Sequence, residues 1–379
     1  MLIAEDEYID SIRIVQERYE QQHGIAPYDL SHWDPGVSFI KQIEQFLRPP
    51  PFEHPLDYLY GSELPDVEQI AARFNIAGAA IGITPSATAS QLLVASMLRA
   101  LGLKRVRLVT PHYFAAFYAL DLVGLQVIRC PLTFEHGNFF LNPELITTEN
   151  AHEAIWITDP VFTVGVPHRA ADEAVLRNAI QRGSWLVIDQ ALARPGEGLH
   201  QRLGESERTI SIHSPHKSIN VNGLKFGAVA LEPRYLRLLD HWSDIVIGGL
   251  PCSACSAINH FLSADFDRAL DVAVRFSIEA RAFMEMAATD VPEAKWSRME
   301  RGIFGSFFFP RINPHWADDM STYRSIVEST GASFIPGSRN QMPAALGFSF
   351  RVNVTRDSPQ GRGAVKRLLH HVALFGSCS

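Results

Sequence analysis

Short apolar runs alternate with helical patterns between about residues 80 and 235. Six of these runs are bounded by glycine, proline or polar residues, as buried strands are: 105–110, 125–131, 153–158, 184–189, 209–214 and 226–232. A helical pattern at 88–102 precedes the first run and another at 169–183 lies between the third and the fourth, and both end on a glycine, where a helix C-cap is expected. This repetition predicts an α/β protein with a mainly parallel sheet covered on both faces, in three α/β/α layers.

The length of 379 residues allows a second, smaller domain. We expect a large α/β domain over 51–285 that ends in a helical region near 255–288. A small α+β domain over 286–379 is expected from the apolar runs at 305–312, 332–338 and 347–354 and a helical pattern at 358–374. The segment 1–50 is expected to pack against the small domain, and the proline-dense stretch 48–55 to form a rigid arm.

The composition is that of an ordinary globular protein, with 46% hydrophobic and 20% charged residues. A net charge of −7 supplies no basic face for phosphate contacts, which disfavours nucleic acid as a partner. The N-terminus is acidic and amphipathic, unlike a signal peptide, and no run approaches the roughly 18 apolar residues of a membrane span. We therefore expect a cytoplasmic protein with a small-molecule ligand and no membrane partner.

The four cysteines are too few and too scattered for a disulfide framework. Cys252 and Cys255 form one C-x-x-C pair, but a structural zinc site needs four ligands and no second pair completes it. We expect no metal site, and the pair is interpreted as buried or surface thiols.

Residues that follow the strands are the candidates for chemistry, because ligands of parallel sheets bind outside the carboxyl ends of the strands. One such stretch is "SPHKSINVNGLKFG", in which Lys217 is followed eight positions later by Lys225. A lysine acts as a nucleophile toward a carbonyl only when its amine loses a proton, and both burial and a neighbouring cation favour that loss. Lys217 is therefore the candidate nucleophile.

This stretch resembles the lysine loop of the aspartate-aminotransferase-like, fold-type-I family of pyridoxal-phosphate (PLP) enzymes. The family pattern is S-x-x-K followed by a Gly-Leu-basic-x-Gly ending, and the matching residues are Ser214, Lys217, Gly223, Leu224, Lys225 and Gly227. The resemblance implies that Lys217 forms a Schiff base with PLP. It also implies that Ser214 and Lys225 hold the phosphate, although the family more often has arginine at the second position. A lysine there serves as a point charge without the bidentate fork.

Other positions match the family in the same order along nearly the whole chain. Ser86, Ala87 and Thr88, in "ITPSATAS", are similar to the phosphate loop that opens a helix. Tyr113 is similar to the aromatic residue that stacks on the pyridine ring. Asp189 is similar to the carboxylate that pairs with the ring nitrogen and keeps the ring an electron sink. Each alone has an ordinary structural explanation, such as a turn, a cap or packing, so the ordered set carries the resemblance.

Two more matches concern the substrate and a partner subunit. Arg351, in "GFSFRVNV", falls where the family has the arginine that clamps the substrate α-carboxylate. Tyr58 falls where the family has a tyrosine that reaches the phosphate of the neighbouring subunit. The resemblance thus implies a homodimer with shared active sites and an amino-acid substrate.

The chain departs from the family around the phenolic oxygen of the cofactor. The family has N-P-x-N-P-T-G after the fourth strand, and here Asp159 takes the place of the first asparagine and Phe162 that of the second. Asp159 is kept as a cofactor-binding candidate. Leu192 stands where the family has a tyrosine that donates to the same oxygen, so both donors are missing, and Thr163 and Gln190 are the open candidates to replace them.

Trp33, in "YDLSHWDPG", stands where the family commonly has a glycine near the substrate. A bulky aromatic side chain at the mouth of the site would stack on a flat or cationic substrate group. Packing of the N-terminal segment is an equally good explanation of this residue.

Two enzymatic functions follow from the resemblance. The first is an aminotransferase that works through the Lys217 Schiff base and a quinonoid intermediate. The second, suggested by the departures, is elimination or cyclisation, similar to capreomycidine synthase, or oxidation of an arginine-derived amino acid in specialised biosynthesis. A PLP-binding regulator is disfavoured because the first 30 residues hold no basic helix-turn-helix pattern, and a dehydrogenase because no G-x-G-x-x-G follows a strand.

Overall fold

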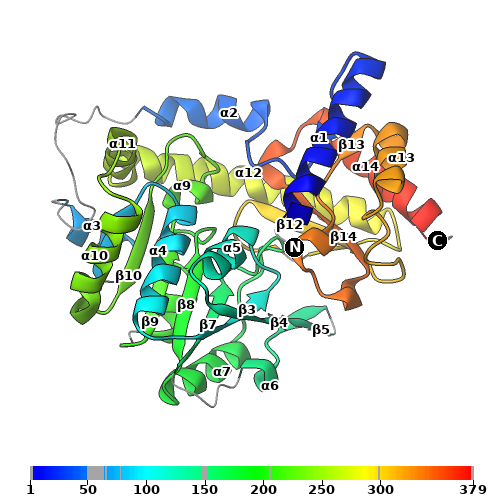
Figure 1. Cartoon of the computed structure of the whole chain (residues 1–379). Coiled ribbons are helices and arrows are strands. Elements are labelled where there is room, and N and C mark those ends of the chain that lie inside the picture. Colours follow the sequence, from blue (N-terminus) through cyan, green and yellow to red (C-terminus); the bar gives the residue numbers. More distant parts are fainter. Residues whose placement is uncertain are drawn as a thin grey trace.

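The computed structural model describes residues 3–48, 64, 66–76, 78–135, 137–146, 152–204, 206–297 and 299–376. Its largest sheet has seven strands and lies at the lower left of Figure 1. From edge to edge the strands are β2 (Ala80–Thr84), β10 (Gly227–Leu231), β9 (Thr209–His213), β8 (Trp185–Gln190), β7 (Glu153–Thr158), β3 (Arg105–Thr110) and β4 (Gln126–Pro131). All neighbouring pairs are parallel except the two that contain β10. The mainly parallel sheet predicted from the sequence is confirmed.

Helices cover both faces of this sheet. Successive side chains of a strand point to opposite faces, so a strand that is apolar throughout needs a helix on each face to bury them. In β7, Ala154 and Trp156 join the apolar core under α4, α5 and α10, whereas Ile155 and Ile157 join the core under α7. Helices α11 and α12 pack over β2 and β10. The helices are α3 (Val67–Arg73), α4 (Ala87–Ala100), α5 (Phe114–Leu122), α6 (Pro143–Ile146), α7 (Ala170–Gln181), α8 (Leu199–Leu203), α9 (Pro215–Ser218), α10 (Leu236–Val246), α11 (Cys252–Phe261) and α12 (Ala264–Thr289). The three predicted layers are therefore present.

The C-terminal part of the chain forms its own antiparallel sheet and core. The strands are β11 (Lys295–Trp296), β12 (Phe304–Phe309) and β14 (Phe348–Asn353), and the helices α13 (Met320–Thr330) and α14 (Pro359–Phe375) pack with them. Helix α12 joins both cores, because Phe276 packs in the core of the large sheet and Phe283 in that of the small one. The division at 51–285 and 286–379 stays a prediction. A short hairpin of β5 (Thr133–Glu135) and β6 (Asn138–Phe140) follows β4.

The N-terminal segment lies beside the small sheet. Helix α1 (Ile3–His23) packs near α13, and β1 (Tyr28–Asp29) pairs in parallel with β13 (Ala332–Ser333). Helix α2 (Val37–Ile43) then packs against α12 at the top of Figure 1. The pairing of β1 with β13 brings residues 30–36 next to the carboxyl edge of the large sheet, where the candidate site lies. None of the described helices combines the length and the hydropathy that a bilayer crossing requires.

Candidate active site

The carboxyl ends of the parallel strands converge on Lys217. This residue lies in α9, directly after β9, and its Nζ is 5.6 Å from the ring centroid of Tyr113 and 5.2 Å from that of Trp33. A narrow cavity joins these three side chains to Asp189 at the end of β8. Its remaining lining residues are Thr158, Pro160, Phe162, Ala191 and Leu192. Four residues predicted from separate stretches of the sequence thus surround one cavity.

The surroundings of Lys217 favour its uncharged amine. Burial lowers the pKa of Lys217, Asp189 partly opposes this lowering through its negative charge, and the positive charge of Lys225 adds to it. An amine that loses its proton more readily is a better nucleophile and a better proton acceptor. The environment therefore suits covalent or acid–base chemistry at Nζ.

Two donors fix the direction of the Asp189 carboxylate. Gln91 Nε2, from α4, donates to Oδ2 at 2.6 Å, and the backbone N–H of Ala191 donates to Oδ1 at 3.0 Å. His112 lies close enough for Asp189 to raise its pKa, although burial has the larger effect and lowers it. Sequence reasoning missed Gln91 and His112: each is a polar residue on a buried surface, and no spacing links them to Asp189.

The N-terminus of α4 forms a donor site at the same edge. Ser86 caps the helix, with its Oγ accepting the N–H of Ala89 at 3.2 Å, and the first N–H groups of a helix have no partner within it. Ala87 and Thr88 supply two of these groups. The start of β10 lies directly against this turn, because a Cβ at Gly227 would come within 2.7 Å of the Ser86 carbonyl carbon. The predicted phosphate loop and the end of the lysine loop are thus adjacent.

Ser214 and Lys225 lie in the lysine loop, thirteen and two residues before Gly227. Ser214 is buried and donates its hydroxyl to the carbonyl of Phe226 at 3.1 Å, which closes the loop. Lys225 is exposed, and its charge acts on Lys217. The loop therefore offers one cation and one buried hydroxyl oxygen close to the α4 N-terminus.

Arg351 approaches the site from the small sheet. Its guanidinium is buried, donates to the carbonyl of Ser31 at 3.1 Å, and lies 5.3 Å from the Trp33 ring and 4.8 Å from the Phe304 ring. Burial lowers its pKa to about 10, and the charge of Asp29 opposes that lowering. Because its hydrogen-bond acceptor is a neutral carbonyl, its charge is available for an anionic ligand.

Trp33 separates the narrow cavity from a wider one of about 550 Å3 and lines both. Its ring meets the ring of Phe304 edge-on at 4.7 Å. Its carbonyl accepts the side-chain amides of Asn222, in the lysine loop, at 2.8 Å and of Asn353, at the end of β14, at 3.4 Å. The two hydrogen bonds fix the backbone of Trp33, and the contact with Phe304 fixes its indole ring within the site.

Phe162 and Leu192 both face the narrow cavity and form an apolar cluster with Ile303 and Phe304. These two side chains stand where the resembled family has hydrogen-bond donors, and they form an apolar wall of the cavity. Thr158, which sequence reasoning did not single out, also lines the cavity. Its Oγ1 accepts the N–H of Phe162 at 3.2 Å, which leaves its hydroxyl proton to donate.

The open candidates Thr163 and Gln190 point elsewhere. Thr163 Oγ1 donates to the sulfur of Met342 at 3.6 Å, and the amide of Gln190 donates to Gln201 Oε1 at 3.1 Å. Neither residue lines the cavity. The structure therefore favours Thr158 over both as a donor toward a ligand there.

Asp159 does not line the cavity, and its cofactor-binding assignment stays a prediction. Its Oδ2 accepts the N–H of Leu199 at 2.7 Å and its Oδ1 that of His168 at 3.3 Å, and Arg202 lies 3.7 Å from Oδ1. The residue is fully buried. The carboxylate ties the segment after β7 to the start of α8, which is a structural role.

Replacing Asp159 by alanine should therefore destabilise the protein without weakening cofactor binding. Two buried N–H groups, of Leu199 and His168, would lose their acceptor, and such a loss costs about 1–3 kcal/mol. Urea unfolding of the cofactor-free protein measures the first effect and PLP titration the second. A variant of unchanged stability that binds PLP more weakly would support the cofactor assignment.

Tyr58 lies outside the described residues, so its position near a partner's phosphate stays a prediction.

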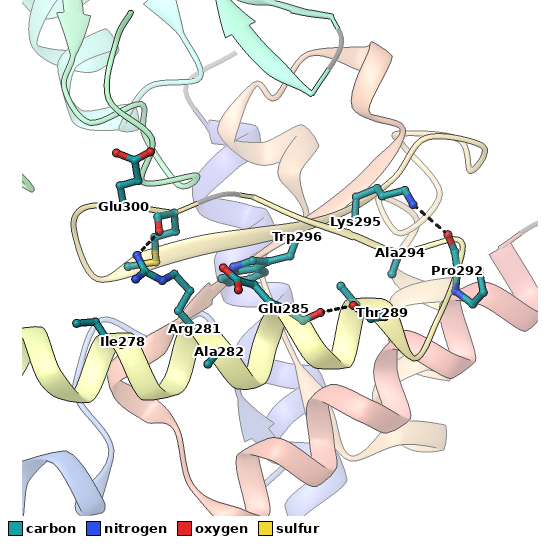
Figure 2. A pocket seen from close by; sticks show the side chains of 12 residues that line it. Ile278, Arg281, Ala282, Glu285, Thr289, Pro292, Ala294, Lys295, Trp296 and Glu300 are labelled. Carbon is teal, nitrogen blue, oxygen red and sulfur yellow. Dashed lines mark hydrogen bonds between the residues drawn. The ribbon is translucent and has the colours of Figure 1, made fainter.

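A larger groove of about 790 Å3 lies elsewhere, between α12 and β11. Figure 2 shows that charged side chains line it and that Arg281 reaches over to the backbone carbonyl of Met299, at 2.6 Å. None of the predicted site residues lines this groove. The candidate site is therefore assigned by the residues that line it and not by the volume of the cavity.

Several solved structures with a similar fold are aminotransferases. An aspartate aminotransferase from Thermus thermophilus with maleate aligns with a TM-score of 0.76, over 95% of this chain and 96% of that one, at 15% sequence identity. A methionine aminotransferase from Escherichia coli aligns with a TM-score of 0.73, over 94% and 95% of the chains, at 16% identity. An aspartate aminotransferase from Thermotoga maritima aligns with a TM-score of 0.72, over 94% of each chain, at 16% identity.

No protein-family model matches the chain, and no curated protein does. The similarity therefore lies in the fold, and it covers nearly the whole chain. The chain has the fold of the fold-type-I PLP-dependent aminotransferases.

Proposed function

We propose that this protein is a PLP-dependent aminotransferase that acts on an α-amino acid. The observation that carries the proposal is the convergence of a buried lysine, an oriented carboxylate and a free helix N-terminus at one edge of the sheet. Each of these groups matches a different part of PLP: its aldehyde, its ring nitrogen and its phosphate.

The residues present fit PLP. Asp189 would pair with the ring nitrogen, the Tyr113 ring would stack on the pyridine, and Ala87 and Thr88 would donate their N–H groups to the phosphate, with Lys225 as counter-charge. When bound, PLP supplies an electron sink that stabilises negative charge at the substrate Cα.

The remaining chemistry falls to the protein side chains. Lys217 would take the proton from the substrate Cα onto Nζ as general base, and Nζ would later release that proton on the same face as general acid. Arg351 would hold the substrate carboxylate, and Trp33 and Phe304 would exclude water from the Lys217 side of the cavity. The Cα–H bond would thereby be directed at Nζ.

Elimination, cyclisation or oxidation of an amino acid is the second candidate. The observation that favours it is the apolar wall of Phe162 and Leu192, with Thr158 as a hydroxyl donor beside it. Fewer donors at the cofactor's phenolic oxygen would stabilise its charged form less. The group that performs the proton transfer, Lys217, is the same in both candidates.

A homodimer with shared active sites is part of the proposal, on the strength of the resemblance at Tyr58. Sedimentation of the protein with PLP bound tests it. A strictly monomeric protein that binds PLP fully would contradict shared sites.

The form of the cofactor after reaction distinguishes the two candidates. The purified protein is incubated with PLP and single amino acids without any acceptor, and the cofactor is then released by denaturation and separated by chromatography. Transamination converts PLP to pyridoxamine phosphate in one half-reaction, whereas elimination or cyclisation returns PLP. Absence of PLP linked to Lys217 after borohydride reduction would overturn both.

A further inference from the structure

The wider cavity, beyond Trp33 from Lys217, is where a substrate side chain would lie. Its volume of about 550 Å3 is within the range of about 300–1,000 Å3 typical of ligand pockets. Its lining comes from the N-terminal segment, the start of α5, the stretch that follows β13, and Arg351 on β14. The chemistry of this lining indicates the class of side chain that fits.

The arginines of this cavity other than Arg351 already have acidic partners. Arg13 lies 2.8 Å from a carboxylate oxygen of Asp10. Arg339 lies 3.8 Å from a carboxylate oxygen of Asp318 and donates to the carbonyl of the same residue at 3.5 Å. The carboxylates of Asp10 and Asp318 therefore offset part of the positive charge that a second carboxylate of a substrate would meet in this cavity.

The carboxylate of Asp29 is also occupied. Its Oδ2 accepts Gln16 Nε2 at 3.0 Å, and its Oδ1 accepts the N–H of Ser31 at 2.9 Å. Gln16 is itself fixed by Ser333, whose Oγ accepts the same amide at 2.8 Å. A cationic substrate group would share this carboxylate with the two donors and with Arg351, whose pKa the charge of Asp29 raises.

Apolar and aromatic side chains form much of the remaining wall, and Ser31, His32 and Asn340 add polar groups to it. Ile12 and Phe334 are buried at its base, and Phe114 and Tyr118 face it from α5 with their rings edge-on at 5.8 Å. Phe114 is 36% exposed, so apolar surface there is in contact with water until a ligand covers it. Covering such surface favours binding of an apolar group.

We infer that the wider cavity receives an uncharged, bulky, apolar or aromatic amino-acid side chain, with Phe114 as a specificity-determining residue. The inference rests on the proposed function, because Arg351 is assigned to the α-carboxylate. It separates this protein from an enzyme of short acidic substrates and from one of guanidino substrates.

Binding of unreactive carboxylates to the protein with PLP bound tests the inference. The probes are 3-phenylpropanoate, succinate and 5-guanidinopentanoate, which have a carboxylate for Arg351 but no amine to react. Dissociation constants come from the change in visible absorption of the bound cofactor or from calorimetry. We expect 3-phenylpropanoate to bind about tenfold more tightly than the other two, since aromatic contacts of this kind are worth about 1 kcal/mol or more.

Phe114→Arg places a cation in the wall at a half-exposed position that tolerates a polar residue. We expect it to weaken 3-phenylpropanoate binding about tenfold and to strengthen succinate binding. Leu122→Arg is the matched control, because it lies on the same helix, is 75% exposed and does not line the cavity. It should leave all three dissociation constants unchanged.

Preference of the wild-type protein for succinate or 5-guanidinopentanoate would overturn the inference, as would equal binding of all three probes or no binding of any at millimolar concentration. So would a Phe114→Arg variant that binds them as the wild type does. Loss of the proposed function has a different signature, namely no PLP linked to Lys217 after borohydride reduction. If PLP is linked there and the probes follow the wrong order, the inference alone fails.

Discussion

Replacing Lys217 by methionine is expected to abolish covalent attachment of PLP and to slow amino-group transfer by at least about 10²–10⁴-fold, the usual contribution of a positioned acid–base group. Nζ would be the nucleophile toward the cofactor aldehyde, and it lies 5.6 Å from the Tyr113 ring centroid and 5.2 Å from that of Trp33. Methionine has similar length and no titratable group, so the walls of the cavity should persist.

The same variant should make the cofactor-free protein more stable near neutral pH. Burial lowers the pKa of Lys217 from its ordinary 10.5, so between the folded pKa and 10.5 the unfolded chain binds more protons than the folded one. The free energy of unfolding of the wild type therefore rises with pH through that window and carries the full cost of the buried charge below it. The variant escapes this cost, so the difference between the two proteins should shrink as pH approaches 10.5.

Thermal unfolding of both cofactor-free proteins across this pH range, with mass spectrometry after borohydride reduction, measures the two effects. Lys225→Met is the comparison variant, since it removes an exposed cation from the same loop. It should weaken PLP binding but leave Lys217 able to attach the cofactor. A Lys217→Met protein that still gains a reducible PLP adduct, or that is less stable than the wild type at all pH values, would contradict the assignment.

Replacing Asp189 by asparagine is expected to slow the reaction about tenfold to a hundredfold with little loss of stability. The variant gives up a charged hydrogen bond to the ring nitrogen, worth about 1.5–3 kcal/mol. The fold should accept the new amide, because Gln91 now donates to Asp189 Oδ2 and its own Oε1 is buried with no partner among the described groups. A flip of the Gln91 amide would turn this acceptor toward the new N–H.

Steady-state rates, PLP dissociation constants and urea unfolding separate these effects in the Asp189→Asn variant. Loss of the negative charge should also lower the pKa of Lys217 and His112 further, because Asp189 raises both. The pH at which activity rises should therefore shift downward. Activity equal to the wild type at every pH would show that Asp189 does not pair with the cofactor.

The pattern of the sequence predicted the sheet because its central strands β7, β8, β9 and β10 are apolar runs buried on both faces. In β7, for example, Ile155 and Trp156 pack into the cores of opposite faces. The direction of β10 was not predictable, since an apolar run looks the same in parallel and antiparallel strands. The antiparallel pairing is what returns Gly227 to the edge where β2 ends at Thr84.

The sequence predicted that residues at strand ends would lie close together. Lys217, Asp189 and Tyr113 do line one cavity. Asp159 also follows a strand, but its side chain turns toward backbone N–H groups of a later helix. Gln91 could not be foreseen, because its partner is 98 residues away and the pairing is visible only in three dimensions. The end of a strand shows which part of the backbone reaches the site. The direction of each side chain depends on contacts with other parts of the fold, which the sequence does not show.

The two hydrogen bonds to the Trp33 carbonyl have a consequence for the order in which parts of the site form during folding. Asn222 and Asn353 are separated from Trp33 by 189 and 320 residues. Contacts of such high sequence separation form late, because the intervening chain must first be ordered. A nascent chain that still lacks β14 can complete the large sheet, yet it has neither Arg351 nor the anchor that holds the indole over Lys217. The wall over Lys217 is therefore complete only after β14 has been synthesised, and a product truncated before β14 would lack both Arg351 and the Asn353 anchor of Trp33.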